Sequence, residues 1–229
     1  MNKKFLAIIP ARGGSKRLLN KNIIELAGKP LISWTLDEAL KSKYLDDIVV
    51  STDDKKIRDV VEKYSSIKII DRPKELSTDT ANTFDALEHT INSIEEKYDY
   101  IVLLQVTSPL RKSFHIDEAI EFLISKNADS VVSVSKTEHS PLWCNTLPKD
   151  LCMKNFLKDE VKNKRSQDLE TYYQLNGAIY ICKVDKLLKE KTFFLEDNIF
   201  AYLMEKKYSI DIDEEVDLKI ADAFLNYYK

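Results

Sequence analysis

Residues 5–22 read FLAIIPARGGSKRLLNKN, a short apolar run that leads directly into a loop with two glycines and several cations. The apolar part, Phe5 to Ile9, has no polar alternation, which is typical of a strand covered on both faces. In α/β sheets, ligands bind beyond the carboxyl ends of such strands. Gly13 and Gly14 allow the backbone to approach a phosphate closely and to present N–H groups to it. The loop cations that would supply positive charge are Arg12, Lys16, Arg17 and Lys21.

This loop lacks the two common glycine motifs for phosphate binding. It contains neither the dinucleotide pattern GxGxxG nor the P-loop pattern GxxxxGK[ST]. Hydride transfer and P-loop nucleotide hydrolysis are therefore not supported. Taken alone, the loop is equally consistent with a glycine turn flanked by solvated cations.

Strand-like and helix-like segments alternate along most of the chain. Further apolar runs predict strands at residues 47–52, 67–70, 100–105, 129–135, 176–183 and 209–213. Helical patterns cover residues 30–43, 55–64, 82–97, 113–126 and 214–228. This alternation implies right-handed crossovers and a mainly parallel sheet with helices on both faces, which is an α/β fold of three layers.

The alternation stops near residue 137. From there to about residue 174 the chain has two prolines, many lysines and aspartates, and no clear periodicity. We therefore expect one domain over residues 1–229 with an inserted arm at about residues 137–174.

Composition narrows the class of protein. With 229 residues, of which 44% are hydrophobic and 32% charged, the chain can bury a substantial core. The net charge is −3, and no basic stripe indicates nucleic acid binding. The three cysteines show no CxxC spacing, which favours reduced thiols in the cytoplasm. The apolar stretch from Phe5 to Pro10 is too short for a signal peptide or a membrane span. We expect a cytoplasmic protein that binds neither nucleic acid nor membrane.

Six sequence blocks carry a resemblance to a known family. They are IIPARGGSKRLLNKN (8–22), STDD (51–54), RPKELSTDTANT (72–83), LLQVTSPLR (103–111), NGAIYI (176–181) and SIDIDEEVDL (209–218). In this order they resemble the motifs of acylneuraminate cytidylyltransferases, which make CMP-activated sialic-type sugars from CTP. The resemblance spans essentially the whole chain. It implies a Rossmann-like nucleotidyltransferase fold, Mg²⁺ as cofactor, CTP and an acidic nine-carbon sugar as substrates, and a homodimer joined through the arm.

The resemblance also implies which residues bind the nucleotide. In the family, the loop after the first strand surrounds the triphosphate, and an arginine and a later hydroxyl recognise cytosine. The matching nucleotide-binding residues are Ala11, Arg12, Gly13, Asn22, Arg72 and Thr83. The expected catalytic residues are Arg12, Lys16, Lys21 and Asp211, because three cations on one loop suit the departure of pyrophosphate. Capping of the following helix is the alternative role for Thr83 and for Asp79.

The sugar site is expected at the end of the central strand. There, Gln105, Thr107, Ser108 and Arg111 would face the ligand crevice, in a stretch where Val106 replaces the family's usual proline. The resemblance assigns an apolar wall for an N-acyl group to Tyr180, Phe193 and Phe194. Plain core packing is the alternative for these three aromatic residues.

The segment SIDID predicts a metal site by geometry. Side chains alternate along a strand, so Asp211 and Asp213 would share one face, about 7 Å apart. Magnesium takes few carboxylates and completes its shell with water and phosphate oxygens. The family uses the matching aspartate pair for metal, so we expect both to bind Mg²⁺, either as one ion held from two sides or as two ions. Capping of the last helix is the alternative role of Asp213.

Two departures from the family pattern concern the sugar carboxylate. Where better-known sialic acid enzymes have basic residues, this chain has Trp143 and Gln174. Arg165, in the expected arm, is a possible replacement cation. The sugar could therefore be a relative of sialic acid, such as legionaminic or pseudaminic acid.

The expected reaction is attack by the anomeric hydroxyl of a 2-keto sugar acid on the α-phosphorus of CTP. Either Asp211 or a water on the metal would accept the proton, and the sequence leaves both open. Two rival functions remain. One is CMP transfer to the eight-carbon 3-deoxy-manno-octulosonate, whose enzymes usually have a GDEP-like segment where this chain has LQVTSP. The other is a catalytically silent nucleotide-binding homologue.

Overall fold

The computed structural model describes residues 3–78 and 80–227, and a seven-stranded sheet forms the centre of this part of the chain. The strand order is β5-β4-β1-β6-β8-β7-β9. Their bounds are β1 Phe5–Pro10, β4 Leu45–Thr52, β5 Lys68–Asp71, β6 Tyr100–Leu104, β7 Ser130–Lys136, β8 Tyr173–Lys183 and β9 Ile199–Met204. All neighbouring strands are parallel except β8, which is antiparallel to both β6 and β7. A two-stranded hairpin, β2 (Glu25–Leu26) and β3 (Lys29–Pro30), stands apart.

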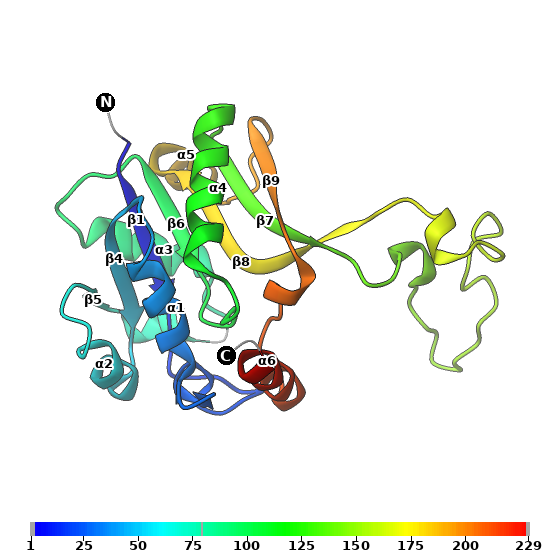
Figure 1. The fold of residues 1–229 in the computed structure, drawn as a ribbon, viewed down its shortest axis with the longest axis horizontal. Helices are drawn as coiled ribbons and strands as arrows, with labels where there is room; N and C mark the ends of the chain where they lie inside the picture. Colours follow the sequence, from blue (N-terminus) through cyan, green and yellow to red (C-terminus); the bar gives the residue numbers. More distant parts are fainter. Residues whose placement is uncertain (1–2, 79, 228–229) are drawn as a thin grey trace.

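Helices cover both faces of this sheet (Figure 1). They are α1 Leu31–Leu40, α2 Lys55–Val61, α3 Thr83–Asn92, α4 Ser113–Lys126, α5 Val184–Glu190 and α6 Glu215–Tyr227. Along β1, Phe5, Ala7 and Ile9 join the core that contains α1, α4 and α6. The alternate residues Leu6 and Ile8 join a second core that contains α3 and α5. A strand buried on both sides explains the unbroken apolar run, and the three-layer α/β prediction is confirmed.

Several elements differ from the sequence prediction. The predicted strand at residues 209–213 is wrong: this segment follows a 3₁₀ turn, η5 (Lys206–Tyr208), and pairs with no strand. Its Ile212 is buried and donates its backbone N–H to the carbonyl of Thr107 at 2.8 Å, which ties the segment to the loop after β6. β9 and α5 were not predicted, and the helix expected at residues 82–97 ends at Asn92. The predicted end of the last helix, Tyr228, lies outside the described residues.

Residues 137–172 leave the sheet between the antiparallel strands β7 and β8 and project as a long extension (Figure 1). We call this segment the arm. Its base is closed by the backbone N–H of Thr137, which donates to the carbonyl of Tyr172 at 3.0 Å. Two short 3₁₀ turns, η3 (Pro141–Trp143) and η4 (Ser166–Asp168), are its regular elements. The arm exposes Leu147, Leu151 and Met153, an apolar surface that has no cover within the described chain.

The strand order places the loops that carry the sequence motifs side by side. β5, β4, β1 and β6 are parallel neighbours, so their carboxyl ends meet at one edge of the sheet. The remaining 3₁₀ turns, η1 (Lys21–Ile23) and η2 (Lys74–Ser77), lie in the loops that follow β1 and β5. Within the ranges described, no helix is both long and apolar enough to cross a membrane.

Candidate active site

A cavity of about 640 Å³ opens at this edge of the sheet. Eleven of the residues predicted from the sequence line it: Arg12, Lys16, Arg17, Lys21, Asn22, Arg72, Thr83, Gln105, Thr107, Asp211 and Asp213. They come from segments up to about 200 positions apart, and the fold brings them into one polar hollow. The structure therefore supports a single ligand site at the carboxyl ends of the strands.

The loop after β1 is held in place by carboxylates of the loop after β4. The Gly13 backbone N–H donates to Asp53 Oδ1 at 3.0 Å. A Cβ atom at position 13 would lie 2.6 Å from Asp54 Oδ2 and 2.9 Å from Asp54 Cβ. Asp54 itself caps α2 by accepting from Ile57 N at 3.0 Å. Gly13 is therefore required by close packing against Asp54, and a phosphate is not needed to explain it.

The nucleotide-side residues are braced by backbone contacts. Asn22 Nδ2 donates to the carbonyl of Arg12 at 2.8 Å, and the Arg12 guanidinium donates to the carbonyl of Thr78. Ala11 is buried and donates its N–H to the carbonyl of Ser51 at 2.9 Å, so it does not line the cavity. These contacts fix the direction in which the loop leaves β1.

Arg72, the residue after β5, is buried and lines the cavity. Its Nε donates to Ser51 Oγ at 3.2 Å and its Nη2 to the carbonyl of Ser51 at 2.8 Å. Burial lowers the pKa of Arg72, the charge of Asp53 acts in the opposite direction, and the charge of Arg12 lowers it further. A buried guanidinium with a fixed orientation is well suited to accurate hydrogen bonding with a planar ligand.

Thr83 is the first residue of α3 and lines the cavity. The alternative role of Thr83 as the helix cap is wrong, because Asn82 is the N-cap and accepts from Phe84 N at 3.0 Å. Asp79, the other capping candidate, lies outside the described residues. Asn82 also lines the cavity, and its position just before an apolar helical face is a sequence signal that identifies the true helix start.

Asp213 binds two cations of the loop after β1. Lys21 Nζ lies 2.9 Å from Asp213 Oδ1, and Arg17 Nη1 lies 3.0 Å from Asp213 Oδ2. The hydrogen bond from Lys21 holds the pKa of Asp213 below its usual value. α6 begins at Glu215, so Glu214 and not Asp213 directly precedes the helix, and the Asp217 side chain accepts from the backbone N–H groups of Asp213 and Glu214 at 3.0 and 2.8 Å.

Asp211 faces the cavity from the same segment. Burial raises its pKa, a hydrogen bond with the side chain of Thr107 acts against this, and the charge of Asp213 raises the pKa further. This effect of the Asp213 charge on Asp211 indicates that the two carboxylates lie close together. Among residues 3–78 and 80–227, no group of three or more His, Cys, Asp or Glu residues could hold a metal, so a cation here would have two carboxylate ligands at most.

Gln105 lies against Gly177, at the sugar side of the expected site. Gly177 has φ +71°, a conformation that favours glycine, and a Cβ atom there would lie 2.7 Å from Gln105 Oε1. The same Cβ would be 3.8 Å from Asp211 Oδ2. Gly177 therefore leaves the space that the Gln105 amide occupies beside the Asp211 carboxylate.

The expectation that Ser108 and Arg111 face the crevice is wrong. Both are buried, and neither lines the cavity. Residues 105–111 turn back after β6, so that Arg111 Nη1 donates to the carbonyls of Gln105 at 3.1 Å and Ala178 at 2.8 Å. Burial lowers the pKa of Arg111 to about 9, and the charge of Glu38 acts against this. Arg111 joins the end of β6 to β8 beneath the cavity floor.

The three aromatic residues assigned to the sugar wall form one cluster outside the cavity lining. The Tyr180 ring lies 5.5 Å from the ring of Phe193 and 6.4 Å from that of Phe194. Phe193 belongs to the second core, and Phe194 is half exposed. Tyr180 is close enough to Asp211 for that charge to raise its pKa, although burial is the larger cause. The cluster thus adjoins the Asp211 side of the cavity.

Other cavity residues were not singled out from the sequence. They are Pro10, Ser15, Leu18, Leu76, Thr78 and Ala81. Thr78 contributes through its backbone carbonyl, which any residue type provides, so no sequence signal marks it.

Two solved structures show where this fold occurs. A CMP:2-keto-3-deoxy-manno-octonic acid synthetase complexed with CTP superposes with a TM-score of 0.75, with 17% identity over 99% of this chain and 100% of the other. A 4-diphosphocytidyl-2C-methyl-D-erythritol synthase from Anaerococcus prevotii superposes with a TM-score of 0.66, also with 17% identity, over 99% of this chain and 100% of the other. At this identity the likeness concerns the fold alone.

Sequence relatives are considerably more similar. An N-acylneuraminate cytidylyltransferase of Streptococcus agalactiae is 42% identical over 98% of this chain, which spans about half (54%) of the relative's length. A CMP-N,N'-diacetyllegionaminic acid synthase of Legionella pneumophila is 37% identical, with 97% of this chain and 96% of the relative covered. A pseudaminic acid cytidylyltransferase of Campylobacter jejuni is 33% identical, with 95% and 94% covered. The cytidylyltransferase family profile matches residues 6–228, and the chain belongs to this family.

Proposed function

We propose that this protein transfers CMP from CTP to the anomeric hydroxyl of an acidic nine-carbon 2-keto sugar and releases pyrophosphate. One observation carries the proposal: a single cavity is lined by a cation-rich loop, a buried arginine and two neighbouring carboxylates. This is the set of groups that nucleotidyl transfer needs, because the chemistry depends on charge neutralisation and alignment. The names of the sequence relatives support the choice of reaction.

For CTP, the cavity offers a polar end for the base and a cationic end for the phosphates. Arg72, held by Ser51, and Thr83 at the start of α3 would hydrogen-bond the cytosine edge. Arg12, Lys16 and Lys21 would contact the triphosphate. Asp213 holds Lys21, so phosphate binding would exchange one anionic partner of this lysine for another.

The two carboxylates fit a divalent cation of the magnesium type. Asp211 and Asp213 line the same cavity, the charge of Asp213 acts on Asp211, and magnesium commonly takes one or two carboxylates together with phosphate oxygens and water. When bound there, Mg²⁺ would neutralise phosphate charge and orient the triphosphate. The ion pairs of Asp213 with Lys21 and Arg17 would have to open or share the carboxylate.

The sugar would bind at the side of the cavity formed by Gln105, Thr107 and Asp211. Its anomeric oxygen attacks the α-phosphorus, the bond from that phosphorus to the bridging oxygen of the β-phosphate breaks, and pyrophosphate departs with the bonding electrons. We propose that Asp211, which lines the cavity on this side, accepts the hydroxyl proton. When it is protonated, the carboxyl group cannot act in this way.

The most specific part of the proposal is which sugar acid serves as substrate. Trp143 and Gln174 stand where sialic acid enzymes have cations, and Arg165 is bound to Asp168 within the arm, its Nε 2.9 Å from Oδ2. We propose a nonulosonic acid as substrate, with sialic, legionaminic and pseudaminic acids as the compounds to test. We also propose that the arm joins two copies of the chain in a homodimer, since it exposes apolar side chains, and that the enzyme acts in the cytoplasm.

The proposal is tested by measuring pyrophosphate release from CTP with a panel of acids, with Mg²⁺ and with a chelator. The panel contains sialic, legionaminic, pseudaminic and 3-deoxy-manno-octulosonic acids. We expect release with a nine-carbon acid, and its loss with the chelator or with the Lys21→Gln variant. Lys63→Gln, an exposed lysine on the segment after α2, is the control and should keep full activity. Release with the eight-carbon acid alone, or CTP binding with no release for any acid, would contradict the proposal.

A further inference from the structure

A second cavity, of about 390 Å³, lies between α1, the start of α4, η5 and α6. It shares no lining residue with the first cavity. Its walls are mainly apolar, with four aromatic rings and two lysines. The aromatic residues are Trp34, Phe114, Tyr208 and Phe224, and the lysines are Lys112 and Lys207. A volume of this size is within the range of small-molecule sites.

The aromatic walls are partly open to solvent. Phe114 is 45% exposed although it is a large apolar residue on the first turn of α4. Its ring meets the ring of Tyr208 edge to face, with centroids 5.9 Å apart, and it contacts His115 at 4.0 Å. Trp34 anchors the opposite wall by donating its Nε1–H to the carbonyl of Leu26 at 3.0 Å. These fixed rings form a preformed slot for a flat apolar group.

The charge at this cavity is positive. Lys112 Nζ lies 6.0 Å from the centre of the Trp34 ring, and Lys29 Nζ lies 3.8 Å from it. Lys207 also lines the cavity and forms an ion pair with Glu205 at 2.9 Å. No carboxylate is among the lining residues in the described part of the chain. The cavity therefore complements an anion.

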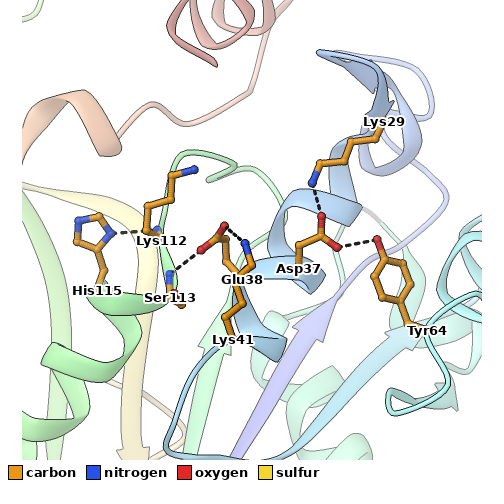
Figure 2. Close-up of polar contacts among 8 residues, drawn as sticks. All are labelled: Lys29, Asp37, Glu38, Lys41, Tyr64, Lys112, Ser113 and His115. Carbon is orange, nitrogen blue, oxygen red and sulfur yellow. Dashed lines mark hydrogen bonds and ion pairs between the residues drawn. The ribbon is translucent and has the colours of Figure 1, made fainter. Parts of the chain in front are cut away.

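The two carboxylates of α1 on this side, Asp37 and Glu38, are occupied by other partners, as Figure 2 shows. Glu38 accepts from Lys41 Nζ at 2.9 Å and from the backbone N–H of Ser113 at 2.8 Å. In the described structure no ion pair joins Glu38 to Lys112, which extends away from His115. Asp37 is held by Lys29 and by the hydroxyl of Tyr64. The ammonium group of Lys112 is thus available to a ligand.

We propose that this second cavity binds a small aromatic anion, whose ring stacks among Trp34, Phe114 and Tyr208 and whose anionic group contacts Lys112. The rings account for affinity through buried apolar area and the lysine accounts for selection of charge. Carboxylates and phosphates satisfy the same requirement.

Two chain segments connect this cavity to the first one. Residues 105–112 contribute Gln105 and Thr107 to the first cavity and Lys112 to the second. Residues 207–213 contribute Asp211 to the first cavity and Tyr208 to the second. The two cavities therefore share these segments, but the binding site proposed here does not depend on the proposed function of the first cavity.

Binding is tested with anilinonaphthalene sulfonate, an aromatic anion, and with N-phenylnaphthylamine, which has the same rings and no charge. We expect one sulfonate bound per chain, detected by quenching of Trp34 fluorescence in a Trp143→Phe background, and clearly weaker binding of the neutral dye. Lys112→Gln should weaken sulfonate binding about three- to fivefold, equivalent to about 0.7–1 kcal/mol, and leave the neutral dye unaffected. Phe114→Ala should weaken both dyes, and Lys63→Gln neither.

Equal affinity for the two dyes, or sulfonate binding that Lys112→Gln does not change, would overturn the proposal and point to an apolar contact surface for another protein. The folded state of each variant is checked by its thermal unfolding midpoint. CTP binding is measured in the same samples by calorimetry. If the sulfonate binds and CTP does not, the proposed function fails and the second site stands; if CTP binds and the sulfonate does not, the reverse holds.

Discussion

Replacement of Gly177 by alanine tests whether the position of the Gln105 amide matters for sugar binding, because its effect on kinetics can be measured separately from its effect on stability. Gly177 has φ +71°, and the new Cβ atom would lie 2.7 Å from Gln105 Oε1. That oxygen is at the end of a flexible side chain, so the amide can turn away at small energetic cost. The backbone cannot adjust in this way, because a left-handed conformation costs a non-glycine residue about 1–2 kcal/mol. The substitution thus has one effect on stability and another on the position of Gln105.

The two effects have different expected sizes. Reduced entropy of the unfolded chain offsets part of the backbone strain, which leaves about 1 kcal/mol of lost stability and a midpoint lowered by about 2–4 °C. Displacement of the Gln105 amide removes a hydrogen bond from the sugar side, and loss of about 1.5 kcal/mol of transition-state binding lowers kcat/KM for the sugar about tenfold. The KM for CTP should stay unchanged.

Gly28→Ala is a matched control for this substitution. Gly28 also has positive φ, +87°, but a Cβ atom there would meet nothing within 4 Å, and the residue does not line the cavity. It should lose a similar amount of stability and keep normal kinetics. The measurements are thermal unfolding and pyrophosphate release at varied sugar concentration. Equal kinetic constants for the two variants would refute the role assigned to the Gln105 amide.

Three further predictions concern the nucleotide and metal residues. Asp211→Asn should lower turnover more than a hundredfold and yet raise the unfolding midpoint at neutral pH. The reason is that a carboxyl group with a raised folded-state pKa destabilises the protein as pH rises through that pKa. The stability gained by the substitution should therefore vanish below about pH 4, where the carboxyl group is protonated in both the folded and the unfolded state. A variant no more stable than the parent at pH 7.5 would contradict this. Lys21→Gln should weaken CTP binding at least tenfold, because Lys21 is one of the two cavity cations bound to Asp213, while Lys63→Gln should not; titration calorimetry with CTP gives the affinities, and equal values would count against the loop. Arg72→Lys should weaken discrimination of CTP from UTP about tenfold, because an ammonium group cannot reproduce the two guanidinium bonds to Ser51; an unchanged ratio of kcat/KM values would exclude Arg72 from base recognition.

The strands and most helices could be predicted from the sequence because their patterns follow from burial. β1 is buried on both faces, and its run from Phe5 to Ile9 is accordingly unbroken. The segment at residues 209–213 has the alternation of a strand without being one. Its Ile212 is buried and its aspartates face the cavity, as alternation requires, but its backbone bonds go to the loop at Thr107 and to no neighbouring strand. Side-chain periodicity records burial, and it does not reveal hydrogen-bond partners.

The candidate site was predictable as far as polar residues lie directly in loops that follow strands. Arg12, Lys21 and Gln105 were placed correctly at the cavity by this reasoning. Arg111 was not placed correctly, because the chain reverses between residues 105 and 111. No sequence pattern indicates that the side chain of this charged residue is buried beneath the cavity and bonded to the carbonyl of Ala178. The reason for Gly13, the approach of Asp54 from another loop, depends on tertiary contact and has no local signature.

Transfer of the α-phosphorus of CTP is the most direct test of the central claim. The protein is incubated with CTP labelled at its α-phosphorus, Mg²⁺ and each nonulosonic acid, and the labelled products are separated by charge. The account predicts label in a conjugate of CMP with the sugar acid, together with an equal amount of unlabelled pyrophosphate. Label that remains in CTP, or that appears only in free CMP without any sugar conjugate at early times, would contradict it.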